Sequence, residues 1–311
     1  MNTLKILVTS QKGGVGKSTI AANIAAYFAT LLRKQVTLID FDHQGTSSTW
    51  VRRAPVPNLQ LKICDVLSVR DAGPVMLKAK QALRDSIGDA QIVVGDLTWV
   101  DVFPPALFFD YDLVLVPTSM SRIELASTMD FVGRFATVFN ASHGKAPRLV
   151  LVPSRLVDGE DYRHMFKQAN FPVRFSLSTP VPFSTQAQES FGSQYLFDTD
   201  DLSLRDGFTR LCGEIESVMK EILLERSNAV KVLQPLRSQV RTGGGASILD
   251  RYVVQREARS PAQHAAEAAI PANATGLMQR FKSKRTAGAP VVPAANSASD
   301  SKWFGFLRRQ S

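Results

Sequence analysis

The sequence has few of the features that stabilise small secreted domains or anchor a chain in a bilayer. Of its 311 residues only Cys64 and Cys212 are cysteines, and they are not arranged as a disulfide framework or a metal site. No apolar run approaches the roughly 18 to 20 residues that a membrane span needs. The first residues do not read as a secretory signal. We therefore expect a cytoplasmic protein, soluble or peripheral to a membrane.

Net charge is absent from most of the chain. Residues 1–230 carry 24 basic and 24 acidic side chains, whereas residues 231–311 carry 13 and 4 and so account for the whole net charge of +9. Beyond residue 228 the sequence is rich in Gly, Ala, Pro and Ser, a composition that buries too little apolar surface to offset chain entropy. The sequence predicts three parts: a folded domain at 1–228, a largely disordered basic linker at 229–300, and a short aromatic and basic motif at 301–311.

Short apolar runs alternate with longer segments of helical period along the first part. The expected strands cover 6–8, 36–39, 92–94, 113–116 and 149–152, and the expected helices cover 19–32, 124–139 and 202–224. Continuous Val, Ile and Leu runs are typical of strands that are buried on both faces. The sequence predicts an α/β fold, a doubly wound, mostly parallel sheet flanked by helices.

A glycine-rich loop joins the first expected strand to the first expected helix. Residues 10–19 read Ser-Gln-Lys-Gly-Gly-Val-Gly-Lys-Ser-Thr. Glycines let successive N–H groups turn toward a phosphate, and the helix N-terminus adds partial positive charge. Lys17 would reach the β- and γ-phosphates and Ser18 would ligate Mg²⁺. The predicted nucleotide contacts are Gly13, Gly14, Val15, Gly16, Lys17, Ser18 and Thr19.

The loop from Lys12 to Ser18 resembles the deviant Walker A loop of the ParA/MinD family of P-loop ATPases, and the resemblance covers about residues 4–225. It implies ATP and Mg²⁺ as cofactors and a homodimer that forms on ATP binding. In such a dimer Lys12 reaches the partner's nucleotide, where a second ammonium offsets charge on the transferring phosphoryl group.

Three carboxylates match acidic positions of the same family. The stretch 40–45, Asp-Phe-Asp-His-Gln-Gly, is similar to the family's Asp-x-Asp-Pro-Gln-Gly. The resemblance implies that Asp42 positions or activates the attacking water, that Asp40 lies near the Mg²⁺ shell, and that Asp96 holds a Mg²⁺-bound water. His43 replaces the family's Pro, and we interpret it as an ordinary loop histidine. Carboxylates at the C-terminal ends of parallel strands face the ligand crevice.

The sequence also departs from the family pattern at three places. Residues 97–99 are Leu-Thr-Trp where the family has Thr-Pro-Pro, so the switch loop differs. Residues 153–155 are Pro-Ser-Arg where relatives have an Asn that reads adenine, which leaves base selection open. Residues 181–183, Val-Pro-Phe, lack the Arg of a DNA-binding motif. Pro182 is nevertheless expected among the nucleotide-binding residues.

The resemblance implies a slow ATP hydrolase, stimulated by an activating partner protein, that partitions or positions DNA or a large cellular assembly. The sequence leaves open which cellular surface the protein binds. The candidates are non-specific DNA at the nucleoid, anionic lipid at the inner face of the cell membrane in the manner of MinD, and a protein partner docked on 301–311. A nucleotide-holding scaffold with little hydrolysis and a small-molecule phosphotransferase are the alternative classes.

Overall fold

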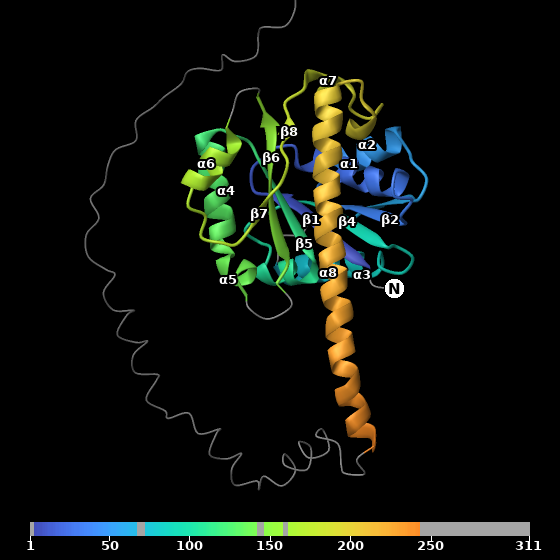
Figure 1. Cartoon of the computed structure of the whole chain (residues 1–311). Helices are drawn as coiled ribbons and strands as arrows, with labels where there is room; N and C mark the ends of the chain where they lie inside the picture. Colours follow the sequence, from blue (N-terminus) through green and yellow to red (C-terminus); the bar gives the residue numbers. More distant parts are fainter. Residues whose placement is uncertain (1–2, 67–71, 142–145, 158–160, 243–311) are drawn as a thin grey trace, which may run out of the picture. The chain divides into compact units, whose positions relative to one another are not determined.

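A computed structural model describes residues 3–66, 72–141, 146–157 and 161–242, with side chains up to residue 228. Eight strands form one parallel sheet in the order β3-β2-β4-β1-β5-β6-β7, and β8 pairs with β6 (Figure 1). The strands are β1 (Leu4–Ser10), β2 (Val36–Asp40), β3 (Leu59–Ile63), β4 (Ile92–Thr98), β5 (Leu113–Thr118), β6 (Arg148–Leu156), β7 (Ser176–Leu177) and β8 (Val181–Pro182). The predicted parallel α/β sheet is confirmed.

Helices cover both faces of the sheet. They are α1 (Lys17–Thr30), α2 (Thr46–Arg53), α3 (Ala72–Arg84), α4 (Arg122–Arg134), α5 (Ala136–Phe139), α6 (Tyr162–Gln168), α7 (Thr185–Glu189) and α8 (Leu202–Thr242), with the 3-10 turns η1 (Pro105–Asp110) and η2 (Leu196–Asp198). No helix in the described part of the chain is long and apolar enough to cross a membrane.

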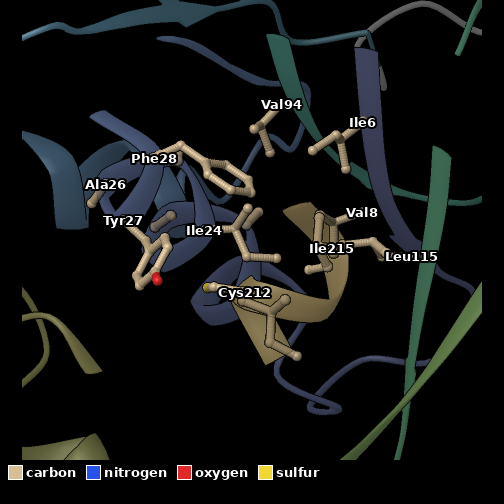
Figure 2. Close-up of a cluster of buried hydrophobic side chains, with 14 of the residues drawn as sticks. Ile6, Val8, Ile24, Ala26, Tyr27, Phe28, Val94, Leu115, Cys212 and Ile215 are labelled. Atoms are coloured by element: carbon tan, nitrogen blue, oxygen red, sulfur yellow. The ribbon is translucent and has the colours of Figure 1, made fainter. Parts of the chain in front are cut away.

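Alternate strand residues supply two separate hydrophobic cores. Ile6 and Val8 of β1 face α1, α2 and α8, whereas Leu7 faces α3, α4 and α5. Figure 2 shows the first core, where Cys212 and Ile215 of α8 lie beside side chains of α1 and of the sheet. This alternation is the period of two that a strand imposes on side chains. Both faces are thereby closed to water, and only the strand ends are left for a ligand.

The second core is dominated by aromatic rings around Trp99. This residue follows β4 directly and is 1% exposed. Its ring stacks on Phe108 at 4.4 Å between centroids and meets Phe135 edge-on at 4.9 Å. Its backbone N–H donates to the carbonyl of Ser10 at 3.0 Å, so the chain after β4 stays attached to the end of β1.

The helices differ from their predicted extents in two places. The single helix expected over 124–139 is divided into α4 and α5 at Phe135, whose ring packs into the aromatic core and whose φ is −109°. The helix expected over 202–224 continues to Thr242 and passes through Pro235. The domain end at residue 228 stays a prediction. The tail motif at 301–311 and most of the linker lie outside the described residues.

Ion pairs join α8 to the amino ends of the strands. Asp112 accepts a hydrogen bond from the backbone N–H of Lys5 at 2.9 Å and pairs with Arg226 of α8. Arg148, the first residue of β6, pairs with Glu221 at 3.2 Å and with Glu225. These contacts attach the helix to the sheet at the amino ends of the strands, opposite the end that carries the glycine-rich loop.

Candidate nucleotide site

The glycine-rich loop lies between the carboxyl end of β1 and the start of α1. Gly14 and Gly16 have φ values of 80° and 84°, in the left-handed region where a side chain brings strain. A Cβ at either glycine would meet no atom within 4 Å, so the loop borders open space. Gly16 is the N-cap of α1, and no side chain caps this helix end. The first N–H groups of α1 are therefore available to an anion.

Lys17 lies beneath the loop between two of the predicted carboxylates. Its Nζ is 2.5 Å from Asp96 Oδ1 and 3.6 Å from Asp42 Oδ2. The same ammonium donates to the hydroxyl of Ser18 at 3.1 Å. Lys17 is only 7% exposed, and a charge so far from water has to be paired. The structure thus brings Lys17 and Ser18 together with Asp42 and Asp96, which lie far from them in the sequence.

Asp42 is kept in its ionised form. Burial works against the charged carboxylate, but hydrogen bonds from Thr98 Oγ1, at 2.5 Å, and from the backbone N–H of Gln44, together with the Lys17 ammonium, outweigh it and lower the pKa of Asp42. A carboxylate that stays deprotonated can orient a water or accept its proton near neutral pH.

Asp96, like Asp40, is fully buried. Burial raises its pKa, although the attraction of Lys17 opposes that shift. Its Oδ2 has no hydrogen-bond partner. An orphaned buried oxygen costs free energy unless a ligand satisfies it. Oxygen donors of this kind suit Mg²⁺, so Asp96 and the neighbouring Ser18 fit the predicted metal site.

Asp40 lies beside Asp96 in the register of β2 and β4. Its Oδ1 accepts from the backbone N–H of Asp42 at 3.1 Å and its Oδ2 from the N–H of Ser48 at 2.8 Å. Asp40 therefore orders the turn that carries Asp42. No three His, Cys, Asp or Glu side chains gather into a metal cluster among the residues described. This is compatible with Mg²⁺, which proteins hold through one or two carboxylates and the phosphates of the substrate.

Two further predicted residues lie on the rim of the site. Lys12 is exposed on the glycine-rich loop, and its carbonyl accepts from Ser10 Oγ at 2.9 Å. His43 is also exposed, with its Nδ1 3.1 Å from Asp65 Oδ2. This placement is consistent with the interpretation of His43 as a loop residue.

A cavity of about 360 Å³ adjoins the glycine-rich loop. Gly14, Gly16 and Thr19 line it, as do Pro182 and Phe183. Trp50 also lines it, and the indole Nε1 of this buried residue has no hydrogen-bond partner. A largely apolar cavity with a few polar groups suits a nucleoside. Pro182 lines this cavity, and its contact with a nucleotide stays a prediction.

Three polar residues of the site were not predicted from the sequence. Thr98 donates to Asp42, and Ser154 and Arg155 of β6 donate to carbonyls of the glycine-rich loop. All three lie in segments that depart from the family pattern. A polar residue at the carboxyl end of a buried parallel strand was the available signal.

Comparison with known proteins agrees with this geometry. The model of the CbiA family, described as the CobQ/CobB/MinD/ParA nucleotide binding domain, matches residues 6–232. The chain belongs to this family of nucleotide-binding domains. The predicted resemblance to ParA and MinD is thereby confirmed.

One curated relative is the maintenance of carboxysome distribution protein A of Gloeobacter kilaueensis. It is 30% identical over 139 residues, which are 44% of this chain and 59% of that protein. The chain thus matches less than two thirds of the length of this relative.

Two solved structures share the fold. The ATP complex of Cyanothece McdA has a TM-score of 0.54 at 13% identity and covers 70% of this chain and 96% of its own. The septum site-determining protein MinD of Pyrococcus horikoshii, complexed with Mg-ADP, has a TM-score of 0.54 at 14% identity and covers 71% and 98%. At these identities the likeness establishes the fold alone.

Proposed function

We propose that the protein is an ATP hydrolase of the ParA type, which uses the nucleotide it holds to place DNA or a large cellular assembly. The observation that carries this proposal is the buried Lys17, held between Asp96 and Asp42 under a glycine-rich loop. Such a lysine serves phosphate binding in P-loop proteins. A phosphotransferase is less well supported, because Lys12 would then have no role.

The contact between Lys17 and Asp42 suggests how binding prepares hydrolysis. The Lys17 ammonium lies 3.6 Å from Asp42 Oδ2. A triphosphate attracts the ammonium more strongly than one carboxylate does, because it carries more charge. Asp42 is then left with its hydrogen bond from Thr98 and is free to orient the attacking water.

Ser18 and Asp96 would hold Mg²⁺, with Asp40 ordering the turn beside them. When bound, Mg²⁺ supplies positive charge that stabilises the charge developing on the transferring phosphoryl group. Lys17 adds to that stabilisation from below the loop. The N–H groups of the loop and of the start of α1 orient the phosphates.

The exposure of Lys12 supports a role toward a second copy of the chain. This residue is exposed on the loop, although a lysine that served only its own nucleotide would be expected to turn inward. We propose that it contacts the nucleotide of the partner subunit in an ATP-bound homodimer. Hydrolysis would then end the dimer, and an activating partner protein would set its rate.

The first experiment measures ATP turnover and oligomeric state together. Purified full-length protein is expected to hydrolyse ATP slowly, and to elute as a dimer with a slowly hydrolysed ATP analogue and as a monomer with ADP. Lys12→Ala should bind ATP as the wild type does but lose the dimer. A protein that binds ATP and dimerises without any turnover would instead be a nucleotide-holding scaffold.

A second experiment identifies the surface. Full-length protein and a 1–300 variant are sedimented with anionic liposomes or with non-specific duplex DNA, each with ATP and with ADP. ATP-dependent liposome binding that requires residues 301–311 would support a MinD-like membrane cycle. DNA binding that weakens with salt and survives the truncation would support a ParA-like cycle on the nucleoid. Binding to neither would support a protein surface.

A further inference from the structure

Two residues at the carboxyl end of β6 donate hydrogen bonds to carbonyls of the glycine-rich loop. Ser154, 2% exposed, donates from Oγ to the carbonyl of Val15 at 2.8 Å. The next residue, Arg155, donates from Nη1 to the carbonyl of Gly14 at 3.1 Å. Two consecutive carbonyls of the loop are therefore held by one strand end.

The hydrogen bonds from Ser154 and Arg155 affect ligand binding through the geometry of the peptide bond. In a planar trans peptide the C=O of one residue and the N–H of the next point in opposite directions. Holding the carbonyls of Gly14 and Val15 therefore fixes the directions of the N–H groups of Val15 and Gly16. Those N–H groups belong to the loop that is expected to receive the phosphates.

Arg155 adopts a backbone conformation that arginine disfavours. Its φ is 58°, in the left-handed region. Among the residues described, only Arg33 and Asn58 are other non-glycines with positive φ. Arg33 lies just beyond the end of α1, where left-handed residues commonly end a helix. Arg155 is the next-to-last residue of β6, at the irregularity between Ser154 and Leu156 where β6 pairs with β8. Bulges of this kind turn a side chain in a new direction and are common next to functional sites.

The side chain of Arg155 also reaches the wall of the nucleoside cavity. Its guanidinium carbon lies 5.8 Å from the centre of the Phe183 ring, within the range of a cation–π contact. Arg155 and Phe183 both line the cavity. One exposed arginine thus connects the cavity to the phosphate loop.

We propose that Arg155 is a positioning residue for the nucleotide. Through its hydrogen bond to the carbonyl of Gly14 it keeps the N–H of Val15 in the direction that receives a phosphate. This inference rests on nucleotide binding as proposed above. It predicts that removing the side chain weakens binding of every ligand with a polyphosphate, whatever the base, and that the strained backbone is retained for binding and not for stability.

Arg155→Gly tests this directly, because glycine accepts a φ of 58° without strain. Affinities for ATP, ADP and inorganic tripolyphosphate are measured by calorimetry beside the melting temperature. We expect each affinity to fall by about tenfold, the effect of losing one hydrogen bond from a charged group. The melting temperature should stay equal to that of the wild type or rise, since strain is relieved.

Arg33→Gly is the matched control. It relieves a positive φ of 50° at another exposed arginine, far from the loop in sequence. We expect it to leave all three affinities unchanged. A salt series adds a second control, because a local hydrogen bond persists at high salt whereas a long-range charge effect is screened.

Several results would overturn the inference. Unchanged affinities in Arg155→Gly would remove the role of Arg155 while leaving the proposed function intact. A loss for ATP and ADP but not for tripolyphosphate would make Arg155 a base contact. A loss that vanishes at high salt would assign it to charge alone. A wild-type protein that binds none of the three ligands would overturn the proposed function as well.

Discussion

Ion pairs lie at both ends of the sheet, but under opposite conditions. At the carboxyl ends, the side chains of Lys17 and Asp96 are 8% and 0% exposed and lie 2.5 Å apart. At the amino ends, the side chains of Arg148 and Glu221 are 39% and 57% exposed and lie 3.2 Å apart. The first pair is dry and leaves one carboxylate oxygen unpartnered, whereas the second is surrounded by water.

This difference shows what burial adds to an ion pair. Water screens the exposed pair, so its contribution to stability is small. The buried pair gains a strong interaction but costs desolvation, and such a pair gives little net stability. A buried ion pair that costs free energy is expected at a site of function. An exposed ion pair costs little desolvation and can serve to attach α8. Five substitutions test this comparison.

Lys17→Ala should have the largest effect on ATP affinity. It removes the buried ammonium, and truncating one partner of a desolvated charge pair costs about 2–5 kcal/mol of binding. We expect ATP affinity to fall by about 30-fold or more, measured by calorimetry. Lys5→Ala, which removes a lysine of the amino end paired with Asp112 at 3.9 Å, serves as the control and should bind ATP normally. Equal losses in both variants would contradict the comparison.

Asp42→Ala should separate binding from turnover. The variant keeps Lys17, Asp96 and the loop, so ATP should remain bound. Turnover should fall by about 100-fold or more, as expected when a catalytic base is removed. Single-turnover assays with radiolabelled ATP measure this, and the ATP-bound dimer should accumulate. Wild-type turnover would remove Asp42 from the reaction.

Asp112→Ala should lower stability and leave ATP turnover unchanged. The substitution leaves the backbone N–H of Lys5 without its acceptor and Arg226 without its partner. An orphaned group of this kind costs about 1–3 kcal/mol. Urea unfolding measures the loss. A fall in turnover at a temperature where the variant is folded would show that the two ends are coupled.

Thr98→Val should change the acid side of the stability profile. Because the pKa of Asp42 is lowered in the folded protein, its ionised form stabilises the fold above the ordinary pKa of about 3.9. That stability is lost as pH falls through the lower folded pKa. Without the Thr98 hydrogen bond the folded pKa rises toward the ordinary value, so less stability is present at neutral pH and less is lost on acidification. Urea midpoints between about pH 2 and 7 measure this, and the effect should disappear in an Asp42→Asn background.

Arg148→Ala should have the smallest effect. Its pairs with Glu221 and Glu225 are exposed, and such pairs contribute about 0–1 kcal/mol. Thermal unfolding at low and high salt should show a shift that disappears with salt. A loss several times larger would mean that exposed ion pairs hold α8 as firmly as its apolar face does.

The sequence predicted the central strands because their buried residues form continuous apolar runs. The outer strands were missed because they lack such continuous buried runs. Strand β3 is only partly buried, with the pattern Leu-Gln-Leu-Lys-Ile, and lies at an edge of the sheet. The strands β7 and β8 have two residues each, too few for a periodic signal.

The candidate site was predictable where a motif fixes a backbone shape. Residues 12–18 gave the loop, and family resemblance gave Asp42 and Asp96. The contacts of Thr98 and Arg155 could not be read in this way, because each depends on how neighbouring strands end in space. The strained φ of Arg155 has no sequence signature at all.

The positions of two tryptophans give the molecule its own optical reporters. Trp50 lines the cavity beside the glycine-rich loop, and Trp99, stacked on Phe108, follows the strand that carries Asp96. Indole emission responds to the polarity and ring contacts around it. Trp50→Phe and Trp99→Phe, each combined with Trp303→Phe, would leave a single indole as the probe, so occupancy of the cavity and movement behind Asp96 could be followed separately in unlabelled protein.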